Sequence, residues 1–272
     1  MIEAASFFPK EEFRSSPLRR LGSPFLDSLA GRIHESIPAL TPDHLSALSA
    51  LSGITGAILA RRYNTHKSAG DSPSSRSALL FLAAGVALDC LDGPLARRIA
   101  LQTPEAIDLV RGSLLDTTGD YLKDVTVGVV KILNAPNSRS RTAASLALGT
   151  NYMARYSIQK GLADGKNVPE IGRNIVEFFS TPTAKSLSNI VESLYPDVGI
   201  LKLQQILDIM ATLGNVASVV TNAVDTPVCE SLVTPKMREI GYARSRFHIG
   251  AIAANIAIVA GVNFALRTKN NK

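Results

Sequence analysis

The chain alternates between long apolar stretches and short polar stretches that carry proline, serine and charged residues. A bilayer core about 30 Å thick is crossed by roughly 20 helical residues, and six of the apolar stretches come near that length. We expect them to form spans at residues 44–60, 78–96, 113–132, 142–162, 201–224 and 248–266. Thr41, Pro42 and Asp43 form a typical helix start just before the first. The pattern predicts an all-α, polytopic membrane protein built as a bundle of six transmembrane helices.

The N-terminal part has a different pattern. Residues 1–22 are polar and basic, whereas apolar residues recur at helical spacing in residues 24–37. This periodicity predicts an amphipathic helix that lies on the membrane surface, although a packing helix of a soluble domain has the same pattern. We therefore divide the chain into an N-terminal segment with the surface helix, residues 1–43, and a six-span domain, residues 44–272.

Composition adds only a little to this picture. The hydrophobic content of 46% is modestly high, so the membrane class rests on the distribution of apolar residues. A net charge of +6 suits anionic lipid headgroups or nucleic acid. No basic patch is interleaved with aromatic residues, so we expect membrane lipids and no nucleic acid as partners.

Four aspartates interrupt the apolar pattern in two pairs. Asp89 and Asp92 are three residues apart, Asp116 and Asp120 are four apart, and on helices each pair shares one face. Both pairs lie beside the same expected loop, so the two faces can meet. Clustered carboxylates repel one another and need cations, and oxygen ligands without His or Cys favour magnesium, manganese or calcium. Solvated acidic faces on a soluble hairpin are the alternative, but carboxylates within apolar runs favour a functional site.

The order of these residues resembles the signature of the CDP-alcohol phosphotransferases, which is D-x-x-D-G-x-x-A-R, a spacer, and G-x-x-x-D-x-x-x-D. The chain supplies every specified position: Asp89, Asp92, Gly93, Ala96, Arg97, Gly112, Asp116 and Asp120. The spacer, residues 98–111, is longer than is usual in the family. We interpret the excess as a small excursion around Thr103 and Pro104, which form a plausible helix start.

The resemblance implies an enzyme of phospholipid biosynthesis. It transfers a phosphatidyl group from a CDP-linked lipid such as CDP-diacylglycerol to a small polar alcohol, releases CMP, and uses Mg²⁺ or Mn²⁺, with two ions expected. By motif position the metal ligands are Asp89, Asp92, Asp116 and Asp120, and Asp120 is also the catalytic general base. The nucleotide site is formed by Gly93, Ala96, Arg97 and Gly112. For Arg97 the alternative is a helix-end arginine that reaches the membrane interface.

The acceptor alcohol is indicated by a second, weaker resemblance. Residues 153–179 are similar to the region after the motif in phosphatidylglycerophosphate synthases, which implies glycerol 3-phosphate as acceptor. Tyr156 stands where an acidic residue is common, so inositol phosphate, serine and other alcohols stay open as alternatives. Arg155 lies within an apolar stretch and needs an anionic partner, either the acceptor phosphate or a carboxylate such as Asp124. Arg173 is a further speculative contact to the acceptor.

Six spans would place both ends of the chain on one side of the membrane, together with the loop between the aspartate pairs. That side carries more Lys and Arg than the other, which favours an active site that faces the cytoplasm. A homodimer is one assembly compatible with this prediction. An alternative from another class is a non-catalytic membrane protein that retains the metal site as a lipid or ion sensor.

Overall fold

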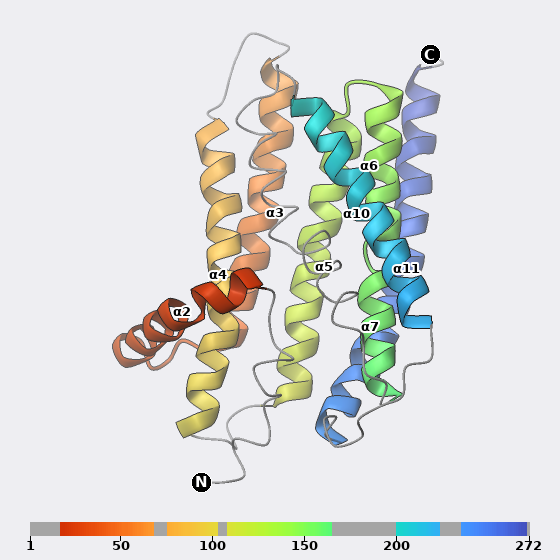
Figure 1. Ribbon diagram of the computed structural model, residues 1–272. Helices are drawn as coiled ribbons and strands as arrows, with labels where there is room; N and C mark the ends of the chain where they lie inside the picture. Colours follow the sequence, from red (N-terminus) through yellow and green to blue (C-terminus); the bar gives the residue numbers. More distant parts are fainter. Residues whose placement is uncertain (1–16, 68–74, 103–107, 165–199, 224–234, 271–272) are drawn as a thin grey trace.

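The computed structural model describes residues 17–67, 75–102, 108–164, 200–223 and 235–270 (Figure 1). Within these ranges the protein is all-helical and contains no β-strand, which confirms the predicted all-α class. The helices are α2 (Pro17–Ser36), α3 (Pro42–Lys67), α4 (Ser75–Gln102), α5 (Leu109–Asn134), α6 (Ser138–Thr150), α7 (Met153–Ala163), α10 (Ile200–Ala223) and α11 (Pro235–Asn270).

The helices form an elongated bundle in which α5 is central (Figure 1). On one side of α5, helix α3 packs against both α4 and α5. On the other side, α5 contacts α6 and α11, while α7 and α10 pack alongside these two helices. Helix α2 lies across the lower part of the bundle and packs against α4 (Figure 1). The central position of α5 brings residues of both halves of the bundle to its surface.

Small residues allow α3 and α4 to pack closely. A Cβ atom added to Gly85 would lie 3.1 Å from the backbone nitrogen of Gly53 and 3.1 Å from the carbonyl oxygen of Ser49. The Ser49 hydroxyl donates a hydrogen bond of 2.8 Å to the carbonyl oxygen of Gly85. The two backbones therefore approach each other closely, as helices do at interfaces that are rich in small residues.

Local capping explains where two helices begin. The hydroxyl of Thr41 accepts the backbone N–H of His44 at 3.3 Å, which confirms the predicted start of α3. The Asp108 carboxylate accepts the backbone N–H groups of Arg111 and Val110, and these bonds lower the pKa of Asp108. Because α5 begins at this cap, ahead of the predicted start at residue 113, the second aspartate pair lies well inside the helix.

The predicted fourth span, residues 142–162, is divided in the structure into two helices, α6 and α7. At the break, the carbonyl oxygen of Leu148 accepts the backbone N–H of Asn151 at 3.3 Å and the Asn255 side chain at 3.0 Å. Asn151 and Tyr152 turn their side chains to Asp124, whose Oδ2 accepts bonds of 3.1 and 3.2 Å from them. These tertiary contacts interrupt the helix although the apolar pattern continues through it.

Helix α11 runs in the same direction as α5. Arg244, near the beginning of α11, contacts Asp116 in the first half of α5, and Leu266, near its end, packs against the core around Ile132. The end of α11 therefore lies at the opposite end of the bundle from α2 (Figure 1).

Helix α10 runs in the same direction as α6. Asp208, in its first half, contacts Lys131 near the end of α5, where α6 begins, whereas Asn215 further along contacts Thr150 at the end of α6. The structure thus differs from the expected strict alternation, which would return the last helix to the side of the surface helix. Apolar periodicity carries no information on helix direction, so the sequence could not supply it.

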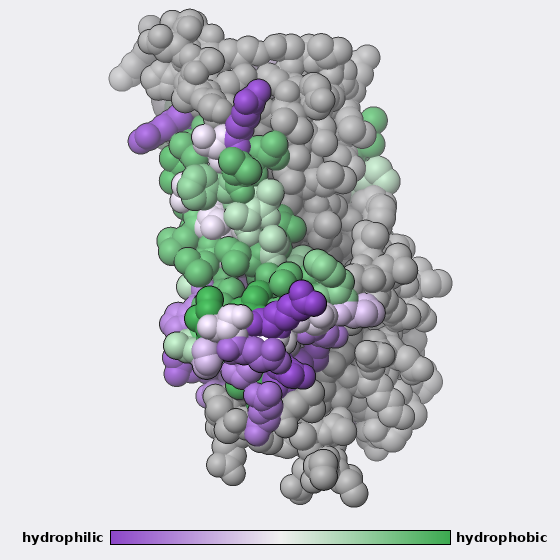
Figure 2. Space-filling view, turned by 90° about the vertical axis from the view of Figure 1, so that its left-hand side faces the viewer, coloured by the Kyte–Doolittle hydropathy of each residue, from purple (hydrophilic) through white to green (hydrophobic). Residues whose placement is uncertain are grey.

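Two helical stretches within the described ranges are long and apolar enough to cross a membrane, Arg76–Ala100 and Pro235–Thr268. Only 28% and 11% of their apolar windows are buried, whereas the core helix of a soluble protein is mostly buried. Figure 2 shows a hydrophobic band over the upper part of α4, where Leu80 and Phe81 are exposed, and hydrophilic residues at the level of α2. These features suggest association with a membrane.

Candidate metal centre between α4 and α5

Three of the four motif aspartates come together between α4 and α5. One carboxylate oxygen each from Asp89, Asp92 and Asp116 lies within 4.8 Å of the others, and all three side chains are half-buried. The predicted meeting of the two aspartate faces is therefore found. Three converging carboxylates offer a set of hard oxygen ligands that could hold a metal ion.

Asp92 is held by two hydrogen bonds. The Ser46 hydroxyl of α3 donates to its Oδ2 at 2.8 Å, and the backbone N–H of Gly93 donates to its Oδ1 at 2.6 Å. These donors fix the carboxylate without adding a charge, so its negative charge stays available to a cation.

Asp120 differs from the other three, because it does not belong to that oxygen cluster and contacts two cationic side chains. The Lys123 ammonium lies 3.0 Å from Asp120 Oδ1, and the Arg155 guanidinium lies 3.2 Å from Asp120 Oδ2. Lys123 also lies 3.1 Å from Asp89 Oδ1, so it joins one aspartate of each pair. A buried ion pair of this kind holds the orientation of both partners.

Arg155 projects from α7 and has carboxylate partners on α5. Besides Asp120 it approaches Asp124 at 3.8 Å, and its guanidinium lies 5.1 Å from the centre of the Tyr152 ring. The anionic partner that sequence analysis requires for Arg155 is thus supplied by two aspartates, one of which is the Asp124 named there. Arg173, the other expected acceptor contact, lies outside the described residues.

Arg244 reaches Asp116 from α11. Its guanidinium lies 3.1 Å from Asp116 Oδ2 and donates to the carbonyl oxygen of Ser113 at 3.3 Å. The Nε atom of Arg244 is buried and makes no hydrogen bond within the described part of the chain. An unpaired, buried N–H group beside the aspartates can bind a further oxygen.

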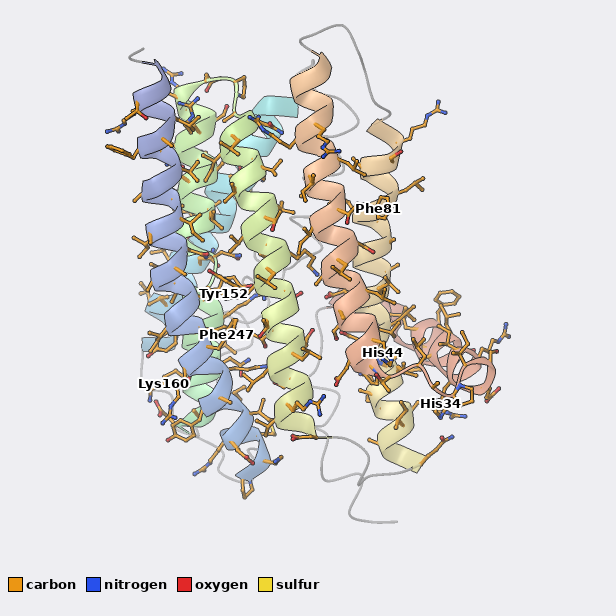
Figure 3. The ribbon with its side chains drawn as sticks, turned by 180° about the vertical axis from the view of Figure 1, so that it is seen from behind. His34, His44, Phe81, Tyr152, Lys160 and Phe247 are labelled. Carbon is orange, nitrogen blue, oxygen red and sulfur yellow. The ribbon has the colours of Figure 1, made fainter. Side chains whose placement is uncertain are left out.

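An aromatic wall lies behind these cations, between α5, α7 and α11. The Tyr121 ring is 5.4 Å from the Tyr152 ring and 5.8 Å from the Phe247 ring, in edge-to-face arrangements. Figure 3 shows Tyr152 and Phe247 side by side on this flank of α5. The rings exclude water from one side of the arginine–aspartate pairs, which strengthens their electrostatic attraction.

The expected nucleotide residues lie along the lower part of α4 and the start of α5. A Cβ atom on Gly93 would meet only Arg97, at 3.6 Å, and one on Gly112 would meet only Asp43, at 3.8 Å, so neither glycine is required for close packing. Ala96 is half-buried on the same helix. Arg97 forms an ion pair of 2.9 Å with Asp27 of α2, which gives it a defined position.

Sequence analysis missed three residues of this centre: Ser46, Lys123 and Arg244. Lys123 could have been identified from the sequence, because it lies three residues after Asp120 and therefore on the same helical face. Ser46 and Arg244 come from α3 and α11, and nothing in their local sequence connects them to the aspartates.

Comparison of the chain with known proteins found no match to a family model, a curated protein or a solved structure.

Proposed function

We propose that the protein is a membrane-embedded CDP-alcohol phosphotransferase, which transfers a phosphatidyl group from CDP-diacylglycerol to a polyol phosphate and releases CMP. One observation carries the proposal. Asp89, Asp92 and Asp116 occupy the carboxylate positions of the signature, and their oxygens gather within 4.8 Å of one another. Scattered acidic residues on a helical hairpin would have no reason to converge in this way.

The donor set fits a divalent ion of the magnesium type. Oxygens within 4.8 Å of one another are close enough to share one ion, because two ligands on opposite sides of an ion with bonds of roughly 2.1–2.4 Å lie no further apart than this. We therefore infer Mg²⁺ or Mn²⁺ at these three aspartates. When bound, the metal neutralises charge on the diphosphate and on the departing CMP.

Asp120 is the proposed general base. The hydroxyl oxygen of the acceptor bonds to the phosphorus of the phosphatidyl group, and the bond from that phosphorus to the oxygen of CMP breaks. The hydroxyl proton passes to the Asp120 carboxylate, which is oriented by Lys123 and Arg155 at 3.0 and 3.2 Å. The fixed orientation of the Asp120 carboxylate supports this role, because a base must lie within hydrogen-bonding reach of the proton that it accepts.

The nucleotide is proposed to lie along the lower part of α4. Gly93 and Gly112 leave the backbone open there, and Arg97 can offer charge-assisted hydrogen bonds to a phosphate group. The Asp27–Arg97 pair is partly exposed, so it is weak enough for a phosphate to compete for the guanidinium.

The cations on the α7 and α11 side support a phosphorylated acceptor such as glycerol 3-phosphate. Arg155 and Arg244 both contact aspartates of α5. The buried Nε–H group of Arg244, which has no hydrogen-bond partner among the described residues, can donate to an anionic oxygen. Serine carries an ammonium group beside its carboxylate and would bring no net negative charge to this side of the centre, and inositol would bring no charge at all.

We infer that α3, α4, α5, the α6–α7 pair, α10 and α11 lie across the membrane. The level of α2 is the proposed membrane surface, which agrees with the change from apolar to polar surface in Figure 2. This end, next to the aspartates, would face the cytoplasm, where CDP-linked precursors and polyol phosphates are available.

The proposal is tested by CMP release from CDP-diacylglycerol in detergent micelles containing the full chain. We expect release with Mg²⁺ and glycerol 3-phosphate, none with EDTA, and lower rates with inositol 1-phosphate, inositol or serine. Asp116→Ala should abolish release and recover only in part at high Mg²⁺. Asp164→Ala removes an aspartate that pairs with Lys160 away from the centre, and should retain full activity. Metal binding without CMP release from any acceptor would favour the ion-sensor alternative.

A further inference from the structure

Lys123 lies between Asp89 and Asp120, where a second metal ion could join the two aspartate pairs. An ion that joins them through Asp89 Oδ1 and Asp120 Oδ1 would lie roughly 2.1 Å from both oxygens. The Lys123 ammonium lies 3.1 and 3.0 Å from these same two atoms. The ammonium and such an ion therefore exclude each other.

The stem of Lys123 is held by its packing. The side chain is 8% exposed, and its Nζ lies within 3.4 Å of the Ser49 hydroxyl of α3. A Cβ atom on Gly53 would lie 2.6 Å from Cγ and 2.7 Å from Cδ of Lys123, so the stem runs directly against the backbone of α3. Withdrawing the ammonium would leave a buried space and would remove the cation next to Asp89, which is costly.

The charges of the centre also favour one divalent ion over two. Within the described part of the chain, the recorded ion pairs join the aspartates of α4 and α5 to three cations, Lys123, Arg155 and Arg244. Five aspartates take part when Asp124 is included, so an excess of two negative charges is left. One divalent ion balances this excess, whereas two would make the centre positive before any substrate is bound.

We propose that Lys123 is a built-in cation that takes the place of one divalent ion, so that the centre binds a single ion through Asp89, Asp92 and Asp116. This inference rests on the proposed function, but it departs from the two ions implied by the family resemblance. Lys123 is a positioning residue, because it acts on the reaction through Asp89 and Asp120.

Binding of Mn²⁺ to the full chain in detergent micelles tests the proposal, by equilibrium dialysis for stoichiometry and by electron paramagnetic resonance for coupling between ions. We expect wild type to bind one magnetically isolated ion per chain. Lys123→Met and Lys123→Gln free the oxygens of Asp89 and Asp120, and should each bind two spin-coupled ions. A purely structural lysine would not change the stoichiometry or create spin coupling.

The matched control is the double variant Lys131→Met with Asp208→Asn. It removes another buried lysine of α5 together with its ion-pair partner, which lies 2.7 Å away, and should still bind one ion. If neither Lys123 variant folds, wild type still decides the question by its stoichiometry. Two coupled ions in wild type, or a single ion in both Lys123 variants, would overturn the proposal.

Parallel measurement of CMP release separates this inference from the proposed function. Two coupled ions in an active wild type would leave the transferase proposal standing and overturn the role of Lys123. One ion in wild type and two in the variants, without CMP release under any condition, would support the role of Lys123 and remove the transferase. A wild type that binds no Mn²⁺ would overturn the role of Lys123, and it would also remove the metal centre from the proposed function.

Discussion

The aspartates of the centre have different environments, although they are chemically identical. Asp92 accepts hydrogen bonds from two uncharged donors, Asp116 pairs with one arginine, and Asp120 contacts two cationic side chains. Carboxylates with uncharged partners retain more of their attraction for a metal ion, whereas one between two cations keeps a fixed orientation. The roles proposed for Asp92 as a metal ligand and for Asp120 as a base follow this division.

At this scale, Asp120→Asn should abolish transfer while nucleotide binding persists. An amide cannot accept the acceptor proton, and loss of a general base typically slows a reaction about 10²- to 10⁴-fold. Steady-state CMP release and binding of a CDP-containing ligand to the same preparation measure the two properties. Turnover within a few-fold of wild type would contradict the assignment of the base.

Arg155→Ala should raise the KM for the acceptor at least tenfold and change the KM for CDP-diacylglycerol little. A charge-assisted hydrogen bond contributes about 1.5–3 kcal/mol, which corresponds to a tenfold effect or more on binding. Lys160→Ala is the control, because it removes a cation from the same helix that pairs with Asp164 away from the centre. A drop in thermal stability with both KM values unchanged would show that Arg155 serves only its aspartate partners.

At the scale of the helices, the centre depends on the contact between α3 and α4. This contact fixes the positions of Asp89 and Asp92 and forms part of the surroundings of Lys123. The contact is made by glycine and serine, so its geometry tolerates little added volume. The other aspartates depend on α5, which α3 contacts from one side and α11 from the other.

Gly85→Ala should lower the free energy of unfolding by about 1–3 kcal/mol, because its methyl group would press on the backbone of α3. Gly250→Ala is the matched control, because an added Cβ atom on Gly250 of α11 would meet no atom of the described residues inside 4 Å. It should be neutral or stabilise by up to about 1 kcal/mol. Thermal unfolding in detergent compares the two. Equal stability of both variants would show that the α3–α4 contact is looser than described.

For the whole molecule, the direction of α11 is the feature that matters most for the membrane arrangement. It places Arg244 beside Asp116 and the end of the helix at the opposite end of the bundle from α2 (Figure 1). A bundle with both ends on one side would need α11 to run the other way, which would remove Arg244 from the centre.

Cysteine labelling tests this arrangement in vesicles of known orientation, after replacement of Cys90 and Cys229. A membrane-impermeant thiol reagent should label Glu35→Cys on α2 from the cytoplasmic side. Arg62→Cys at the far part of α3 and Thr268→Cys at the end of α11 should be labelled only from the other side. Detergent should make all three reactive. Labelling of Thr268→Cys together with Glu35→Cys would contradict the direction of α11.

The local features of this protein could be derived from its amino-acid order. Apolar periodicity predicts the helices, Thr41 marks the start of α3, and the spacing of the aspartates puts each pair on one face with oxygen ligands for a hard cation. These properties depend on neighbours along the chain, within one or two helical turns, so the sequence contains them.

Contacts between distant segments could not be derived in this way. Leu148 and Asp124 break the predicted fourth span through Asn151, Tyr152 and Asn255, and the directions of α10 and α11 follow from packing. The partners of the aspartates also come from remote helices: Ser46 from α3, Arg155 from α7 and Arg244 from α11. Even Lys123, close in sequence to Asp120, acquires its role from Asp89 on α4 and from the space beside Gly53. Such pairings depend on how the helices pack, because the free energy of a buried charge is set by the groups around it in space.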